Sequence, residues 1–231
     1  MKLLAIDTST DWISVAAADA DGGRDIVLEA PASNAHSGHV MPLVHRALGE
    51  AGWRLGDLDA IAFGAGPGAF TGVRIACAVA QGLALGAGLP LVAIGTLEAI
   101  AESAWRQHGG ERVVAALDAR MQEVYVAAYA REGGAWREVV APFVARPDDV
   151  DLPRDAWLGA GDGFARYPAL AQCVGASRVH ADVRPGARAI VALAAPRVAA
   201  GDVVAAHDAH PVYVRHRVAL TLAEREAGVH L

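Results

Sequence analysis

The chain has 231 residues, of which 54% are hydrophobic and 20% charged, and its formal net charge at pH 7 is −6. This composition excludes an intrinsically disordered chain and is sufficient for one large domain or two small lobes. The acidic balance argues against a surface built mainly to hold nucleic acid, although a partner of this chain could do so.

The N-terminal run and the cysteines indicate a reducing compartment. Residues 3–6 form an apolar run that is far too short for a signal peptide or a membrane span, and no later window of membrane length is free of charge. Cys77 and Cys173 lie in apolar surroundings without metal-type spacing, which favours two buried thiols. We therefore expect a cytoplasmic protein without a membrane partner.

The first half of the chain has a pattern of alternating strands and helices. Three apolar runs joined by polar or glycine turns predict an antiparallel meander. Later apolar residues recur at helical spacing, with buried runs between them. In chain order we predict strands at 3–6, 13–18 and 25–30, a helix at 40–51, a strand at 58–63, a helix at 73–89, a strand at 89–94, and a helix at 96–105 with Thr96 as its N-cap.

The second half opens as the first does, with a strand, an aspartate turn and a returning strand. This similarity predicts a weak internal duplication of supersecondary structure. We expect one lobe over residues 1–108 and a smaller lobe over 109–231, whose last segment packs back on the first. The predicted elements are strands at 113–120 and 123–129, an irregular stretch at 142–153, a short strand and glycine turn at 157–163, a helix at 187–200 and an extended segment at 210–215.

Residues 64–74 contain a glycine loop between a buried strand and a long helix. The loop has the sequence Gly-Ala-Gly-Pro-Gly-Ala-Phe-Thr-Gly-Val-Arg. Because this order leaves backbone N–H groups at a helix N-terminus, it is typical of a phosphate-binding loop. A tight strand-to-helix turn is the alternative interpretation. A second polar turn, Asp7-Thr8-Ser9-Thr10, follows the first predicted strand.

Four motifs in this order closely resemble those of the bacterial TsaB family, also called YeaZ. They are Asp7-Thr8-Ser9-Thr10, the loop 66–74, Leu117-Asp118-Ala119-Arg120 followed by residues 123–125, and residues 211–215. The resemblance runs from residue 3 to residue 215. It implies an α/β, actin/hexokinase/Hsp70-like (ASKHA) fold of two lobes, each a mixed β-sheet flanked by helices. It also implies a noncatalytic partner in making N6-threonylcarbamoyladenosine (t6A) at position 37 of tRNA.

By this resemblance the turns at Asp7 and Asp118 face each other across a cleft and form a vestigial nucleotide or phosphate site. The hydroxyls and amides of the first turn and of the glycine loop would suit a phosphate, and the carboxylates would position Mg²⁺ through water. The residues of this site would be Asp7, Thr8, Ser9, Thr10, Gly66, Gly68 and Asp118. In the alternative interpretation, both aspartates only end strands and bond nearby amides.

No catalytic residue and no metal site is assigned. The catalytic paralogue, TsaD, carries a His-x-x-x-His metal pair, whereas His36 and His39 are three apart and no acidic third ligand matches. His45 lies six residues further on. His207, Asp208 and His210 are expected to form a solvated loop.

The resemblance further implies that the chain joins TsaD through two helices of its first lobe. The candidate helices are residues 36–51 and 71–87, and the second has the small-residue face that close helix packing needs. The predicted interface residues are Val40, Met41, Val44, Leu48, Thr71, Arg74, Ala78 and Gly82. A second copy would cover this face when TsaD is missing, and the small ATPase TsaE would dock at the junction, near the glycine loop and Arg74. The chain itself would need no cofactor, the complex would use ATP and Mg²⁺, and tRNA would be reached through the complex.

Two other functions remain open from the sequence. One is a small ATPase or kinase of the same superfold that uses Asp7 and Asp118. The other, metallopeptidase activity, is disfavoured because the chain lacks His-Glu-x-x-His and a Ser/His/Asp arrangement. Residues 142–186 match no pattern that assigns them a role.

Overall fold

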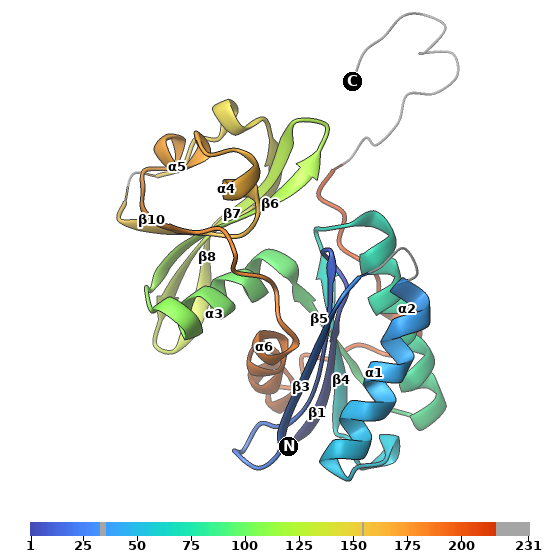
Figure 1. Cartoon of the computed structure of the whole chain (residues 1–231). Coiled ribbons are helices and arrows are strands. Elements are labelled where there is room, and N and C mark those ends of the chain that lie inside the picture. The colour runs from blue at the N-terminus through green and yellow to red at the C-terminus, as the bar shows by residue number, and fades with distance from the viewer. Residues whose placement is uncertain (33–35, 154, 216–231) are drawn as a thin grey trace, which may run out of the picture.

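The computed structural model describes residues 1–32, 36–153 and 155–215, which form two five-stranded mixed sheets with helices around them (Figure 1). The first sheet contains β1 (Lys2–Asp7), β2 (Trp12–Asp19), β3 (Asp25–Pro31), β4 (Ala60–Gly66) and β5 (Leu91–Gly95). The second contains β6 (Arg112–Arg120), β7 (Glu123–Glu132), β8 (Ala135–Ala145), β9 (Trp157–Ala160) and β10 (Ala176–His180). The helices are α1 (His36–Ala51), α2 (Phe70–Ala87), α3 (Thr96–His108), α4 (Gly163–Arg166), α5 (Leu170–Cys173) and α6 (Ala187–Ala199).

The two sheets have the same topology. The strand order is β3-β2-β1-β4-β5 in the first sheet and β8-β7-β6-β9-β10 in the second. In each sheet the first three strands pair antiparallel, and the fourth and fifth continue in parallel. The predicted duplication and the predicted two-lobe α/β fold are therefore confirmed. The stretch 142–186, to which the sequence assigned no role, supplies β9 and β10, the fourth and fifth strands of the second sheet; β9 lies within the short strand predicted at 157–163.

Helices cover both faces of the first sheet. Alternate residues of β1 point to opposite faces: Leu4 and Ile6 pack with α1 and α2, whereas Leu3 and Ala5 pack with α6. Helix α3 lies between the sheets, where Leu97 packs with residues of the second sheet. Both lobes are thus built on sheets that are buried by apolar residues, as the sequence pattern predicted.

The C-terminal part of the described chain returns to the first lobe. Helix α6 packs against β1, β2, β4 and β5. Beyond it, Leu91 and Val204 form an antiparallel bridge, and the Val212 N–H donates to the Ala65 carbonyl at 2.7 Å. The last described segment therefore runs along the glycine loop that ends β4.

Helix α2 has one buried and one open face. Its buried residues, which pack against the sheet, are Gly72, Val73, Ala76, Cys77, Ala80 and Ala84. By length and composition alone it could cross a membrane, and among the described residues no other helix could. Core helices of globular proteins can meet the same criterion, and α2 buries one face against the first sheet while the other face stays open.

Three local predictions were wrong. The stretch 142–153 is not wholly irregular, because β8 continues to Ala145; as an edge strand it accommodates Pro142, which has no N–H to donate. Gly95, not Thr96, is the N-cap of α3, and the buried Thr96 Oγ1 has no partner among the described residues. Cys77 is buried as expected, but Cys173 is exposed because the one-turn helix α5 buries only Leu170.

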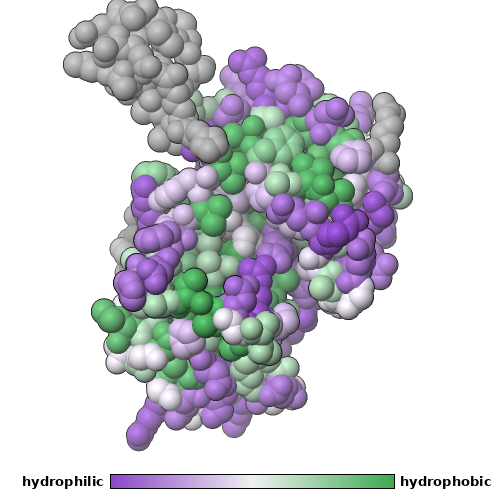
Figure 2. Space-filling model, turned by 180° about the vertical axis from the view of Figure 1, so that it is seen from behind, coloured by the Kyte–Doolittle hydropathy of each residue, from purple (hydrophilic) through white to green (hydrophobic). Residues whose placement is uncertain are grey.

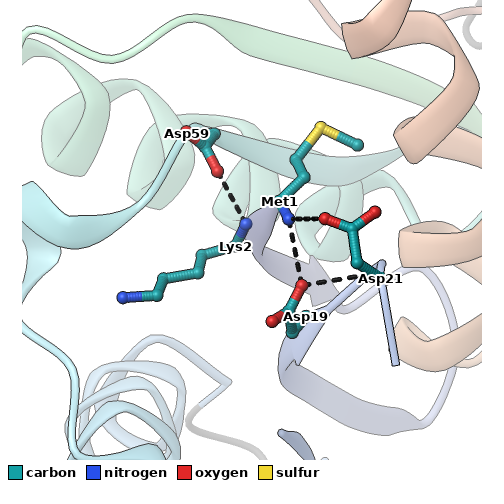
Figure 3. A network of polar contacts seen from close by, with 5 residues as sticks. All are labelled: Met1, Lys2, Asp19, Asp21 and Asp59. Atoms are coloured by element: carbon teal, nitrogen blue, oxygen red, sulfur yellow. Dashed lines mark hydrogen bonds and ion pairs between the residues drawn. The ribbon is translucent and has the colours of Figure 1, made fainter. Parts of the chain in front are cut away.

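The N-terminal amine is held by a small acidic network (Figure 3). The Met1 amine donates to Asp19 Oδ1 at 3.0 Å and to Asp21, and the Asp21 N–H donates to Asp19 Oδ1 at 3.1 Å. The next residue along, Lys2, donates its N–H to Asp59 Oδ2 at 2.7 Å. These bonds fix the start of β1 against the turn that follows β2 and against Asp59, the residue that precedes β4.

An N-terminal extension is expected to weaken this start of the fold in a pH-dependent way. The two carboxylates raise the pKa of the Met1 amine above 8.0, so their stabilising effect is complete below that pH and is lost as the pH rises through the folded-state value. We expect the extended protein to unfold at a lower temperature than the unextended one near pH 7, and at the same temperature near pH 11. Thermal unfolding of both forms checks this, and an equal gap at the two pH values would contradict it.

Candidate functional site

The polar turn after β1 packs directly on the glycine loop after β4. The Ala69 N–H donates to the Ser9 carbonyl at 2.7 Å, and the Thr8 hydroxyl donates to the Gly72 carbonyl at 2.6 Å. A Cβ at Gly72 would overlap the carbonyl oxygen of Thr8, and one at Gly68 would overlap that of Ser9. The glycines therefore permit close approach of the chain's own backbone, which occupies part of the surface that a phosphate would need.

Asp7 lies behind this contact. Its side chain is buried, and its carboxylate accepts from the Ser9 N–H at 3.1 Å and from the Ser9 hydroxyl at 2.9 Å. On its other side is Gly64, where a Cβ would overlap the carboxylate. Burial raises the pKa of Asp7 from 3.8 to about 7, although the two bonds from Ser9 oppose the shift. This is the geometry of the alternative interpretation, in which the aspartate ends a strand and bonds a nearby amide.

The second lobe repeats the arrangement around Asp118. The Asp118 carboxylate accepts from the Arg120 N–H at 3.0 Å, and the Asp118 N–H donates to Asp162 Oδ1 at 2.9 Å. Gly161 has a φ of +107°, and a Cβ there would overlap the carbonyl oxygen of Ala116. Partial desolvation, together with the charge on Asp118, raises the pKa of Asp162. The second turn is thus supported by a glycine turn, as the first is.

A cleft of about 530 Å³ separates the two turns. The structure brings Ser9, Thr10, Gly68 and Asp118 into its wall, whereas Asp7, Thr8 and Gly66 do not line it. Gly66 instead lies against the last described segment, since a Cβ there would be 2.8 Å from the Val212 carbonyl oxygen. Of the seven residues predicted for this site, the cleft therefore collects four. An Mg²⁺ site that needs both Asp7 and Asp118 does not match this geometry.

The sequence analysis missed two groups at this cleft. Asp162, in the turn after β9, faces Asp118; the signal was Gly161-Asp162-Gly163 directly after a short strand. The other group forms around Arg74, whose guanidinium lies 3.3 Å from the Phe70 ring centre and donates from Nε to the Tyr213 hydroxyl at 2.8 Å. The sequence analysis named Arg74 as an interface residue, but no local pattern predicts its contact with Tyr213, because the two residues lie 139 positions apart.

In the structure, the predicted interface residues on α2 are exposed, whereas most of those on α1 are buried. On α2, the exposed residues include Thr71, Arg74, Ala78 and Gly82, which recur three or four residues apart along one stripe. On α1, Met41 is half-buried, but Val40, Val44 and Leu48 are buried in the core against the first sheet. Those three residues are therefore not open to a partner, because the sheet itself needs the apolar face of α1.

Large apolar side chains remain open to solvent near the cleft and on α2. Leu85 is 76% exposed, Phe70 is 55% exposed and Tyr213 is 50% exposed. Seen from behind, the molecule shows several hydrophobic areas between polar ones (Figure 2). Within the described part of the chain, no three His, Cys, Asp or Glu side chains are grouped as metal ligands would be. His45 is exposed, and His207 pairs with Asp208 at 3.4 Å on the surface.

Comparison with known proteins gives consistent matches over both lobes. A family model described as "TsaD: tRNA N6-adenosine threonylcarbamoyltransferase" matches residues 27–166. The tRNA threonylcarbamoyladenosine biosynthesis protein TsaB of Escherichia coli (strain K12) is 40% identical, covering 95% of this chain and 96% of the relative. TsaB of Haemophilus influenzae is 35% identical, covering 94% of this chain and 95% of the relative.

The solved structure of YeaZ from Pseudomonas aeruginosa superposes with a TM-score of 0.86 at 41% identity, covering 92% of this chain and 99% of that one. These matches span the duplicated sheets, the glycine loop and the returning C-terminal segment. The chain belongs to the TsaB (YeaZ) family.

Proposed function

We propose that this chain acts in t6A biosynthesis as a noncatalytic subunit that binds TsaD and holds it in its active conformation. The chain belongs to a family whose members are named for this pathway. Energetically, such a subunit works by population shift, because it binds the active conformer of its partner better than the inactive one. TsaE would join at the junction, ATP and Mg²⁺ would be used by the complex, and tRNA would be reached through it in the cytoplasm.

The observation that carries the proposal is the open stripe of α2. Thr71, Ala78, Gly82 and Gly86 are small and exposed, and Leu85 stands out beside them. Small residues at this spacing let another helix approach closely, and an exposed leucine supplies apolar area to bury. A second copy of the chain would use the same stripe in the absence of TsaD.

The cleft gives weaker support to a kinase or ATPase. It has room for a small ligand, and Asp118 and Asp162 reach it. However, Asp7 is buried and accepts a hydrogen bond from the Ser9 N–H, and the Thr8 hydroxyl already donates to the Gly72 carbonyl. A reaction that depends on Asp7 and Asp118 together would therefore require the first turn to rearrange.

The test is the effect of a charge on the α2 stripe. Ala78→Glu places a carboxylate on this exposed face, and it is expected to weaken binding to the host's TsaD by about tenfold or more. Ala165→Glu, on the exposed side of α4 in the other lobe, is the matched control and should bind as the wild type does. Glutamate at Ala80 or Val44 would not be informative, because both side chains are fully buried.

Size-exclusion chromatography with light scattering gives the measurement. The wild-type chain should elute with TsaD as a heterodimer at micromolar concentration, and the same column shows whether the chain alone is a dimer. Separate elution of the two wild-type proteins at low salt would end the proposal. If Ala78→Glu and Ala165→Glu bind TsaD equally well, the contact surface does not include the α2 stripe.

A further inference from the structure

The chain leaves the first lobe after α3 and returns to it before α6, and a histidine stands at the start of each connection (Figure 1). His108 is the last residue of α3 and precedes residues 109–111, which lead into β6. His180 is the last residue of β10 and precedes residues 181–186, which lead into α6. The two imidazole rings are stacked, with centres 3.6 Å apart and planes inclined by 8°. The stack therefore joins the two connections, which we call the hinge segments.

The backbone of the first hinge segment has the freedom that a hinge needs. Gly109 and Gly110 have φ angles of +69° and +95°, and a Cβ at Gly109 would meet no atom within 4 Å. The Gly109 N–H donates to the Trp105 carbonyl at 2.9 Å, and in the second hinge segment the Val183 N–H donates to the His180 carbonyl at 3.3 Å. Since glycines absorb changes of φ and ψ at little cost, side-chain contacts such as the stack must hold these segments in place.

The surroundings of the stack favour neutral rings. The Nε2 atoms of His108 and His180 are both buried, and neither has a hydrogen-bond partner among the described residues. A protonated ring would hold a charged N–H there without an acceptor, which is more costly than a neutral group in the same place. Two protonated rings at this spacing would also repel each other. Protonation therefore favours separation of the rings, which returns Nε2 to water.

The nearby charges only partly balance this preference. Asp182 in the second hinge segment favours a protonated His180, whereas Arg178 on β10 and His108 on α3 oppose it. Burial and the neighbouring His108 together lower the pKa of His180 below 6.5. Other charged residues beside the hinge segments have partners of their own or are exposed: Arg106 pairs with Glu102, Arg112 pairs with Asp155, Arg184 lies over the Trp12 ring, and Glu111 is exposed.

We propose that the His108–His180 stack is a pH-sensitive clamp on the hinge, which holds the two segments together while both rings are neutral and releases them on protonation. Because the pKa of His180 is lowered in the folded state, the clamp is complete above about pH 6.5 and is lost as the pH falls through the folded-state value. Asp7 acts in the opposite direction, since its raised pKa makes the fold more stable as the pH falls. A loosening at low pH that is confined to the hinge segments therefore cannot come from Asp7.

The clamp lies away from the α2 stripe, so it can fail or hold independently of the proposed binding to TsaD. Hydrogen exchange of the full chain, followed by mass spectrometry at about pH 7.5 and about pH 5, tests it. After correction for the intrinsic pH dependence of exchange, the hinge segments should exchange about tenfold or more faster at the lower pH. The amides of β4, in the core of the first lobe, should not change.

A double variant separates the clamp from other effects of pH. His108→Phe combined with His180→Phe keeps two aromatic rings that cannot ionise, so exchange of its hinge segments should change by less than about twofold. His45→Phe combined with His210→Phe makes the same exchange at two exposed sites and should respond to pH as the wild type does. The proposal is overturned if the wild-type hinge segments do not respond, if the His108/His180 variant responds equally, or if β4 loosens to the same extent.

A titration of the wild-type chain keeps the proposal testable even where the double variant does not fold. The His180 ring signal in a carbon–proton NMR spectrum, assigned by its loss in His180→Phe, should titrate with a midpoint below 6.5. That midpoint should rise in His108→Phe, because the neighbouring charge is gone. A wild-type midpoint at or above 6.5, or one that His108→Phe leaves unchanged, would show that the two rings do not act on each other and would overturn the clamp.

Discussion

Replacing Gly72 by alanine is expected to lower the free energy of unfolding by about 3 kcal/mol or more. The added Cβ would overlap the Thr8 carbonyl oxygen at a point where the first turn and α2 are already joined by the bond from the Thr8 hydroxyl to the Gly72 carbonyl. The obstacle is buried backbone on both sides, so no side-chain rotation relieves it. Urea unfolding followed by circular dichroism gives the free energy and its denaturant slope.

The matched control is another glycine of the same helix. Gly82 is exposed and has no atom within 4 Å of an added Cβ, so Gly82→Ala should raise the stability by up to about 1 kcal/mol through helix propensity. The two substitutions add the same methyl group to α2 and should act in opposite directions. Similar stabilities of the two variants would mean that the close contact between the first turn and the glycine loop is not maintained in solution.

Asp7→Asn is expected to make the protein more stable near pH 8 and to remove much of its pH dependence. The folded state holds the pKa of Asp7 at about 7, against 3.8 in the unfolded chain. Between these values the folded state retains a proton that the unfolded state has lost, so wild-type stability falls as the pH rises through this range. At about 1.4 kcal/mol per pKa unit, the full penalty above pH 7 is on the order of 4 kcal/mol.

Asparagine cannot ionise but keeps an oxygen that accepts from the Ser9 N–H. The stability difference between Asp7→Asn and the wild type should therefore shrink by about 4 kcal/mol from pH 8 to pH 4. Asp151→Asn, at an exposed aspartate of the second lobe, is the control and should show no such trend. A difference for Asp7→Asn that is constant over this range would mean that the carboxylate is hydrated rather than buried.

The order of the helices and strands could be predicted from the sequence because most of them are long enough to show the spacing of apolar residues that is typical of a strand or a helix. The runs of β1, β2, β4 and β6 are apolar, and α1 and α2 span several turns. The second lobe was less predictable between β8 and α6. The short strand β9 was predicted, but α4 and α5 were not, because they have four residues each, which is too few for a period of 3.6 to be recognised.

The candidate site was predictable in its residues but not in their orientation. Helical spacing identified the apolar face of α1. An apolar face has the same sequence pattern whether it packs against the chain's own sheet or against a partner protein, so the sequence could not distinguish the two. The predicted interface residues Thr71, Arg74, Ala78 and Gly82 lie three or four positions apart on α2, and the structure leaves all four exposed. The motif correctly placed Asp7 at the end of the first strand. Only the structure shows that its carboxylate points toward Gly64 and away from the cleft.

The return of α6 to the first sheet has a consequence for synthesis on the ribosome. A nascent chain that has emerged only as far as residue 186 can already pair every strand of both sheets, yet Leu3, Ala5 and Ile94 lack the helix that covers them. The first lobe is thus synthesised first but completes its folding last. The second lobe is inserted in sequence between β5 and α6 of the first lobe, so it is fully synthesised before α6 emerges. Until then its bare apolar surface must be shielded by chaperones or by the speed of the last stretch of translation.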